Sequence, residues 1–193
     1  MASWRPAFAS SKVHLASESG AGATSLALHM ARLVLEDGQR VLWAAPEMPD
    51  PTRFSQVIGG LPPTASTRFH AMNLVGRMDL ITASLQQAAT SLPGVGLVVM
   101  DDWAPATGRI SAASLDAVCG LLTGLGEVPL VATAKLGTDM DADDGFRVRA
   151  EDRLTAAGFA SWRMTVAPNG IRCLEGPNGV ERLRVVDEGL ESV

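Results

Sequence analysis

The sequence has few cysteines, few histidines and no long apolar run. Its two cysteines, Cys119 and Cys173, lie far apart and form no CxxC pair, so neither a disulfide scaffold nor a zinc ribbon is predicted. The histidines His14, His29 and His70 are equally scattered and predict no metal site. No apolar run approaches the roughly 18 residues that a membrane span needs, and the N-terminus has no apolar signal core. The sequence therefore predicts a soluble, cytoplasmic protein.

Charge is also scarce. Charged residues make up 19% of the 193 residues and the formal net charge is -5, which excludes both a disordered polar chain and a strongly basic nucleic-acid coat protein. Hydrophobic residues make up 47% of the chain, enough for a sizeable core. We expect a single domain over residues 1–193, with at most weak or indirect contact to nucleic acid.

Short apolar runs alternate with segments of helical periodicity, the pattern of a parallel sheet wrapped by helices. Strands are expected at residues 12–16, 41–45, 95–100 and 129–134. Helices are expected at 24–36, around 54–58, at 80–92, at 114–125 and near 151–157. The segments 61–67 and 136–146 are predicted to be loops.

The last third of the chain has a different pattern. Short strands are expected at 162–166, 171–174 and 182–186, and they are separated by PNG and GPNG turns. Such turns predict antiparallel hairpins added to the edge of the sheet. The predicted fold class is therefore α/β, a mostly parallel twisted sheet flanked by helices, with C-terminal antiparallel strands.

The turn after the first strand has the layout of a phosphate-binding loop. On the pattern G-x-x-x-x-G-K-[ST], Gly22 and Thr24 match, Ser17 replaces the first glycine and Ala23 replaces the lysine. Backbone N–H groups and the helix dipole can bind a phosphate without that lysine, although a purely structural turn gives the same pattern. The predicted phosphate-binding residues are Ser19, Gly20, Ala21, Gly22, Ala23, Thr24 and Ser25.

The missing lysine matters more for turnover than for the fold. Its ammonium group would contribute about 1.5–3 kcal/mol, and more as charge develops on the γ-phosphate. Slow or absent hydrolysis is therefore expected.

Three further residues at strand ends are candidates for the same site. Glu47 follows the second strand, where a carboxylate can orient an attacking water; the alternative is a solvated loop residue. Asp101 ends the most apolar strand and would hold a magnesium ion through water together with Thr24, or simply cap the next turn. Lys135 is one of two lysines in the chain and either reaches a γ-phosphate or is a surface lysine.

These residues resemble a known family. The segments SESGAGATSLALHMARL, VLWAAPEMPDPTRF, LVVMDDW, PLVATAK and NGVERLRVVDEGLES are similar to the RecA-like core of the archaeal RadA and RadB recombinases and of KaiC- and DnaB-type ATPases. The resemblance spans nearly the whole chain. It implies a RecA-like fold, ATP and Mg²⁺ as cofactors, Glu47 as the water-positioning residue and Asp101 as the Walker B aspartate. Lys135 falls where the family has a polar sensor residue, and Ala23 and Ser17 depart from the family pattern.

The resemblance also bears on nucleic acid. In RecA-like proteins the loops after these strands face DNA. Here the loop 136–146 has no basic residue, and its acidic residues would repel phosphates: Asp139, Asp141, Asp143 and Asp144. The usual mode of DNA binding is therefore not expected.

Assembly is the other property that the resemblance implies. RecA-like ATPases bind nucleotide at a subunit boundary, so we expect a protein partner or a homo-oligomer. Lys135 and Arg109 would lie on such a face, and Trp4 and Phe8 would dock on a neighbour. The chain starts almost directly at the first core strand, so neither the N-terminal helical domain nor the polymerisation segment of full recombinases is expected.

Three functions are open from the sequence. The first is an accessory or regulatory subunit with a catalytically degenerate site, in DNA recombination, repair or replication. The second is a slow but genuine ATPase that uses Glu47, Asp101 and Lys135, and the third is an interaction module that keeps only the fold. Loss of the lysine favours the first over the second. Retention of Glu47, Asp101 and Thr24 favours the first over the third.

Overall fold

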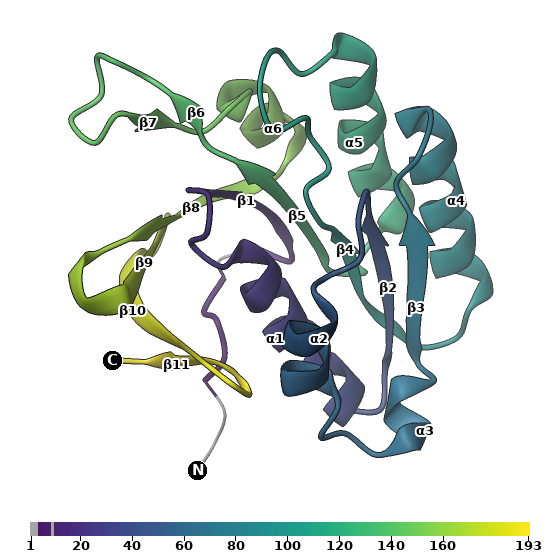
Figure 1. Cartoon of the computed structure of the whole chain (residues 1–193). Coiled ribbons are helices and arrows are strands. Elements are labelled where there is room, and N and C mark those ends of the chain that lie inside the picture. The colour runs from purple at the N-terminus through teal and green to yellow at the C-terminus, as the bar shows by residue number, and fades with distance from the viewer. Residues whose placement is uncertain (1–3, 9) are drawn as a thin grey trace.

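A nine-stranded mixed sheet forms the centre of the molecule (Figure 1). The computed structural model describes residues 4–8 and 10–193. The parallel strands are β1 (Lys12–Ser17), β2 (Arg40–Ala45), β3 (Phe69–Asn73), β4 (Val95–Met100), β5 (Leu130–Lys135) and β8 (Ala160–Val166). The antiparallel strands are β9 (Ile171–Gly176), β10 (Gly179–Val186) and β11 (Gly189–Ser192). The order across the sheet is β11-β10-β9-β8-β1-β5-β4-β2-β3, which confirms the predicted fold class.

Helices cover both faces of the sheet. On one face lie α1 (Ala23–Glu36), α2 (Pro51–Ile58) and α3 (Pro63–Ser66), whose apolar residues pack with Val41 and Trp43 of β2. On the other lie α4 (Met78–Ser91), α5 (Ala112–Leu125) and α6 (Glu151–Ala157), which pack with Leu42 and Ala44. Alternate residues of β2 thus enter opposite cores, because successive side chains of a strand point to opposite faces. A 3₁₀ turn, η1 (Pro168–Gly170), joins β8 to β9.

Two segments predicted as loops contain regular structure. Residues 61–67 include the helix α3, which begins at Pro63, a residue type well suited to the first turn of a helix. Residues 136–146 form most of a hairpin whose two short strands are β6 (Gly137–Thr138) and β7 (Phe146–Arg147). The sequence pattern does not predict β3, because this edge strand is only half-buried and shows no clear alternation of apolar residues.

The N-terminal segment packs on the chain's own core. The Phe8 and Trp162 rings meet edge to face, with centroids 4.9 Å apart. The Trp4 indole N–H donates to Glu181 at 2.9 Å, and the Trp4 carbonyl lies 2.7 Å from Nε2 of His29. The expectation that Trp4 and Phe8 dock on a neighbour is therefore wrong, since both are used within the chain.

Cys119 and Cys173 are free and half-buried. His14 lies in the core, where burial, followed by the nearby charge of Arg149, lowers its pKa to about 4. The ring is therefore neutral at physiological pH. In the ranges 4–8 and 10–193, no helix has the length and apolar character needed to cross a membrane.

Candidate functional site

The turn between β1 and α1 presents backbone N–H groups at the carboxyl edge of the sheet. Gly20 and Gly22 have φ angles of 77° and 101°, a left-handed conformation that glycine adopts without strain. The N–H of Ala21 donates to the carbonyl of Glu18 at 3.1 Å and closes the turn. Gly22 is the N-cap of α1 and provides no side-chain cap for the first N–H groups of the helix. This arrangement is suited to binding an anion such as phosphate.

Asp101, directly after β4, is the centre of a buried hydrogen-bond network. Only 4% of the Asp101 surface is exposed. The carboxylate accepts from the Thr24 hydroxyl at 3.0 and 3.2 Å and from the Thr133 hydroxyl at 2.7 Å. Burial raises the pKa of Asp101, and the two hydroxyl donors oppose that shift. Asp101 and Thr24, the two residues predicted to hold magnesium, are thus in direct contact.

A pocket of about 410 Å³ opens beside this network. Thr24 and Ser25 from α1, Glu47 from the segment after β2, and Asp101 line it together. The fold therefore brings the predicted catalytic carboxylates to one pocket at the start of α1. Four acidic residues and one basic residue line it: Glu47, Asp50, Asp101, Asp102 and Arg53. The pocket carries a surplus of negative charge unless a cation is bound.

Lys135 lies at the predicted edge of the sheet, but its charge is paired. Its Nζ is 3.4 Å from Oδ2 of Asp102. In the parallel register of β1 and β5, Lys135 is opposite Ser17, the last residue of β1 and the first position of the phosphate-loop pattern. Asp102 itself is held in place, because its N–H donates to the Thr133 hydroxyl at 2.8 Å. The lysine is therefore adjacent to the turn and engaged with an acid of the same chain.

The residue at the position of the missing lysine has little exposed surface. Ala23, the first residue of α1, is 6% exposed and packs in the core cluster that contains Leu26 and Ala27. Ser17, which stands where the pattern has its first glycine, is 2% exposed. Both departures from the phosphate-loop pattern are therefore buried positions.

Arg53 is a residue of the site that sequence reasoning missed. From α2, its guanidinium donates to the Ser25 hydroxyl at 2.9 Å and to the carbonyls of Val186 and Gly189 at 2.7 and 2.9 Å. It thereby fastens the turn between β10 and β11 to the start of α1. The carbonyl partners lie 133 and 136 residues further along the chain, so no local sequence signal could indicate them.

The phosphate-binding turn also makes hydrogen bonds to the C-terminal strands. Nε of Arg172, on β9, donates to the Ala21 carbonyl at 2.7 Å, and its Nη1 donates to the Gly170 carbonyl at 2.8 Å. The Glu18 carboxylate accepts from the Val166 N–H at 2.9 Å. The antiparallel strands therefore support the turn as well as extending the sheet.

The residues present include oxygen ligands for a magnesium ion. The Thr24 hydroxyl and the Asp101 carboxylate are hard oxygen ligands of the kind that Mg²⁺ prefers. When bound, that ion neutralises charge on the phosphates. The backbone of the turn offers N–H donors to a phosphate, but Ala23 offers no ammonium group. The turn thus keeps oxygen ligands for a metal ion but lacks the positive charge that a phosphate loop normally supplies.

Comparison with known proteins identifies the fold. No protein-family model matches the chain, and no curated protein matches its sequence. Among solved structures, the crystal structure of the RadB recombinase matches with a TM-score of 0.73 and 21% sequence identity, over 96% of this chain and 92% of that chain. The fold is RecA-like. A likeness at this identity shows the fold and leaves the activity to be argued from the site.

Proposed function

We propose that the chain is one RecA-like core domain whose nucleotide site is degenerate and which acts as an accessory or regulatory subunit in DNA recombination, repair or replication. The fold that it shares with the RadB recombinase supports this context. The observation that carries the proposal is the buried Ala23 where a phosphate loop has lysine, beside a Thr24–Asp101 contact that is kept at 3.0 Å. The expected result is weak binding of ATP with Mg²⁺ and hydrolysis close to background.

Each predicted residue has a role in this proposal. The backbone from Ser19 to Ser25 contacts the phosphates, Thr24 holds the magnesium ion together with Asp101, which acts through water, and Glu47 faces the attacking water. The acidic surplus of the pocket makes binding depend on Mg²⁺, because unscreened carboxylates repel a triphosphate. A protein partner or a second copy of the chain completes the function, and contact with nucleic acid is indirect.

A slow ATPase is the second candidate, and the position of Lys135 favours it. This lysine lies opposite Ser17 at the end of the neighbouring strand. Release from Asp102 would let its ammonium group approach a phosphate bound at the turn. Part of the missing charge would then be replaced.

Steady-state ATP hydrolysis by the purified chain tests the proposal. Wild type is compared with Ala23→Lys and with the matched control Ala112→Lys. Ala112 is exposed and is the first residue of α5, as Ala23 is the first residue of α1. Wild type and the control should stay at background, and Ala23→Lys should hydrolyse ATP faster.

Two outcomes would overturn this proposal. Wild-type turnover in the range of about 1–10³ s⁻¹, usual for enzymes, is incompatible with a degenerate site. Slow wild-type turnover that is lost in Glu47→Gln and Lys135→Ala, but kept in the exposed control Glu188→Gln, would establish the slow ATPase instead.

A further inference from the structure

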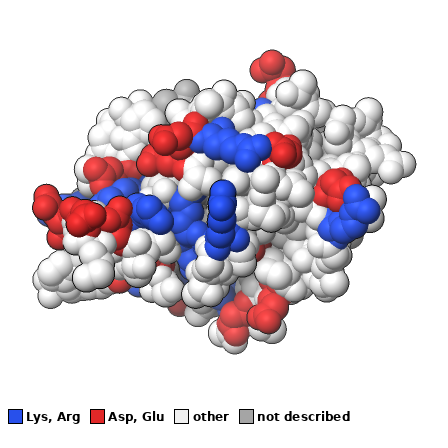
Figure 2. Space-filling model, turned by 90° about the horizontal axis from the view of Figure 1, so that it is seen from above, with Lys and Arg blue, Asp and Glu red and all other residues white. Residues whose placement is uncertain are grey.

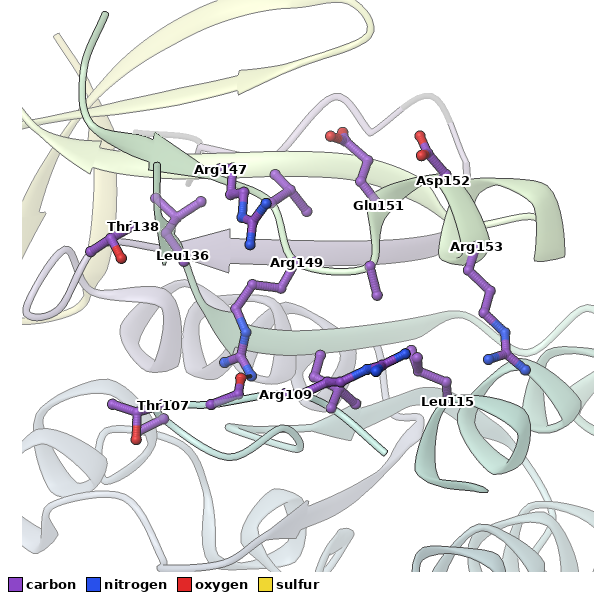
Figure 3. A pocket seen from close by; sticks show the side chains of 16 residues that line it. Thr107, Arg109, Leu115, Leu136, Thr138, Arg147, Arg149, Glu151, Asp152 and Arg153 are labelled. Atoms are coloured by element: carbon purple, nitrogen blue, oxygen red, sulfur yellow. Dashed lines mark hydrogen bonds between the residues drawn. The ribbon is translucent and has the colours of Figure 1, made fainter. Parts of the chain in front are cut away.

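A second hollow lies between the loop after β4 and the hairpin β6–β7. It encloses about 1050 Å³, and Figure 3 shows the side chains around it. Its floor is apolar, because Ile110, Leu115 and Leu136 line it and are only 6%, 7% and 9% exposed. Four arginines also line it: Arg109, Arg147, Arg149 and Arg153. We call this site the arginine hollow.

Two of the four arginines are already engaged. Arg149 donates to the carbonyls of Pro105 and Gly108 at 2.6 and 2.7 Å, which fixes the loop after β4. Arg153 pairs with Asp116 of α5. These contacts shape the hollow and leave its other two arginines to meet a ligand.

Arg109 and Arg147 are the two arginines of the hollow that are left to meet a ligand. Both are exposed, and within residues 4–8 and 10–193 neither side chain takes part in an ion pair or hydrogen bond. The charge of Arg147, after burial, lowers the pKa of Arg149, so positive charges lie close together here. The hollow therefore suits a ligand that combines carboxylates with an apolar group.

The tip of the β6–β7 hairpin, residues 139–144, has the complementary chemistry. Met140 is 100% exposed, and the acidic residues Asp139 and Asp141 stand on either side of it. The Asp141 N–H donates to the Asp139 carboxylate at 3.1 Å, which holds the turn in shape. The tip therefore presents one exposed apolar side chain with a negatively charged residue on each side.

The tip points away from the hollow of its own chain. Asp144 pairs with Arg163 of β8, which draws the tip to that side. Thr138 and Arg147 at the base of the hairpin line the hollow, whereas none of residues 139–146 does. Figure 2 shows the same separation, with basic side chains over the middle of this face and an acidic cluster at the end where Figure 1 places the hairpin.

We propose that the hairpin tip of one copy inserts into the arginine hollow of a second copy. Met140 would then contact the apolar floor, and Asp139 and Asp141 would pair with Arg109 and Arg147 of the other copy. Such a contact is head-to-tail, so each copy keeps a second surface free and assembly proceeds to open chains or rings. The inference rests on the proposed function only because it names the contact that would join two copies of the chain. The contact itself needs no nucleotide.

The chemistry of the hollow favours an acidic protein segment over a nucleic-acid strand. Proteins that bind single strands combine a basic groove with aromatic side chains that stack on bases, and among the residues that the structure describes no aromatic side chain lines this hollow. Glu151 and Asp152 of α6 also line the hollow and offset part of the positive charge of its arginines. Paired arginine and carboxylate groups form strong charge-assisted hydrogen bonds, often bidentate.

The test is light scattering coupled to size exclusion over a concentration series of the whole chain. The hollow variant Arg147→Glu has Arg182→Glu as its control, an exposed arginine on β10. The tip variant Met140→Ser has Val180→Ser as its control, an apolar side chain that is 60% exposed. Wild type and both controls should reach at least twice the chain mass of 20.2 kDa, and each variant alone should stay monomeric.

An equimolar mixture of the two variants gives the sharpest result. The hollow variant still has a tip and the tip variant still has a hollow, so the mixture should form a dimer and stop there. This rescue also shows that both variants are folded. Assembly of either variant like wild type, a monomeric wild type at all concentrations, or a monomeric mixture would overturn the inference.

Nucleic-acid binding and ATP hydrolysis by the same variants distinguish this contact from a nucleic-acid site and from the proposed function. Binding of a fluorescent single-stranded oligonucleotide that is lost in Arg147→Glu but kept in Met140→Ser and Arg182→Glu would make the hollow a nucleic-acid site and overturn the inference. A monomeric protein with weak nucleotide binding would overturn this inference alone. Fast ATP hydrolysis by a protein that assembles as described would overturn the proposed function alone.

Discussion

Replacing Arg53 by alanine is expected to release the C-terminal hairpin from the phosphate-binding turn. The guanidinium donates to Ser25, Val186 and Gly189 over distances of 2.7–2.9 Å. Hydrogen bonds to a charged group contribute about 1.5–3 kcal/mol each. Arg53 is half-buried and water replaces part of each bond in the variant, so we expect a total loss of about 2–4 kcal/mol in the free energy of unfolding.

Thermal unfolding and hydrogen exchange measure this effect. In a chain of this size, about 1 kcal/mol corresponds to ~2–4 °C in melting temperature, so the midpoint should fall by about 4–16 °C. Amide exchange should increase in β10 and β11 more than in β4, because the Arg53 hydrogen bonds hold only the turn between β10 and β11. Arg182→Ala serves as the control. A shift below about 2 °C, or an increase in exchange spread evenly over the sheet, would refute the role given to Arg53.

Two further substitutions test the packing and electrostatics of the site. Burial raises the folded-state pKa of Asp101 above its unfolded value, so wild type loses stability as pH rises from about 3.9 toward the folded pKa. In urea unfolding, Asp101→Asn should therefore be more stable than wild type at pH 7 and equally stable at pH 3. The exposed control Asp143→Asn should match wild type at both pH values. A lower stability of Asp101→Asn at pH 7 would contradict this. Gly189→Ala should lower the melting temperature more than Gly179→Ala. Both glycines have positive φ, but a Cβ at Gly189 would clash with the His29 ring, whereas one at Gly179 would meet nothing within 4 Å among residues 4–8 and 10–193. Equal effects of the two substitutions would show that the His29 contact is unimportant.

Much of the fold could be predicted because its strands are buried on both faces. β4 is a continuous apolar run and β5 is mostly apolar, and such strands are typical of parallel-sheet interiors. α1 and α5 bury residues at helical spacing. β3 could not be predicted, because an edge strand that is half exposed needs neither alternation nor a continuous apolar run.

The candidate site could be predicted only where motif spacing fixes it. Thr24 and Asp101 each belong to a local pattern, and the parallel sheet brings their two segments together. The Thr133 hydroxyl and the Arg53 contacts depend on strand register and on a distant hairpin, which no local pattern encodes. Trp4 shows the same limit, since an apolar side chain indicates a contact but not whether its partner is in the same chain.

Calorimetric titration with a non-hydrolysable ATP analogue, with and without Mg²⁺, tests the central claim most directly. A degenerate site predicts weak, Mg²⁺-dependent binding by wild type and by the control Ala112→Lys. Ala23→Lys should bind about 10- to 150-fold more tightly, which is the factor for a charge-assisted contact of about 1.5–3 kcal/mol. Tight binding by wild type that Ala23→Lys leaves unchanged would contradict the claim that the missing lysine limits this site.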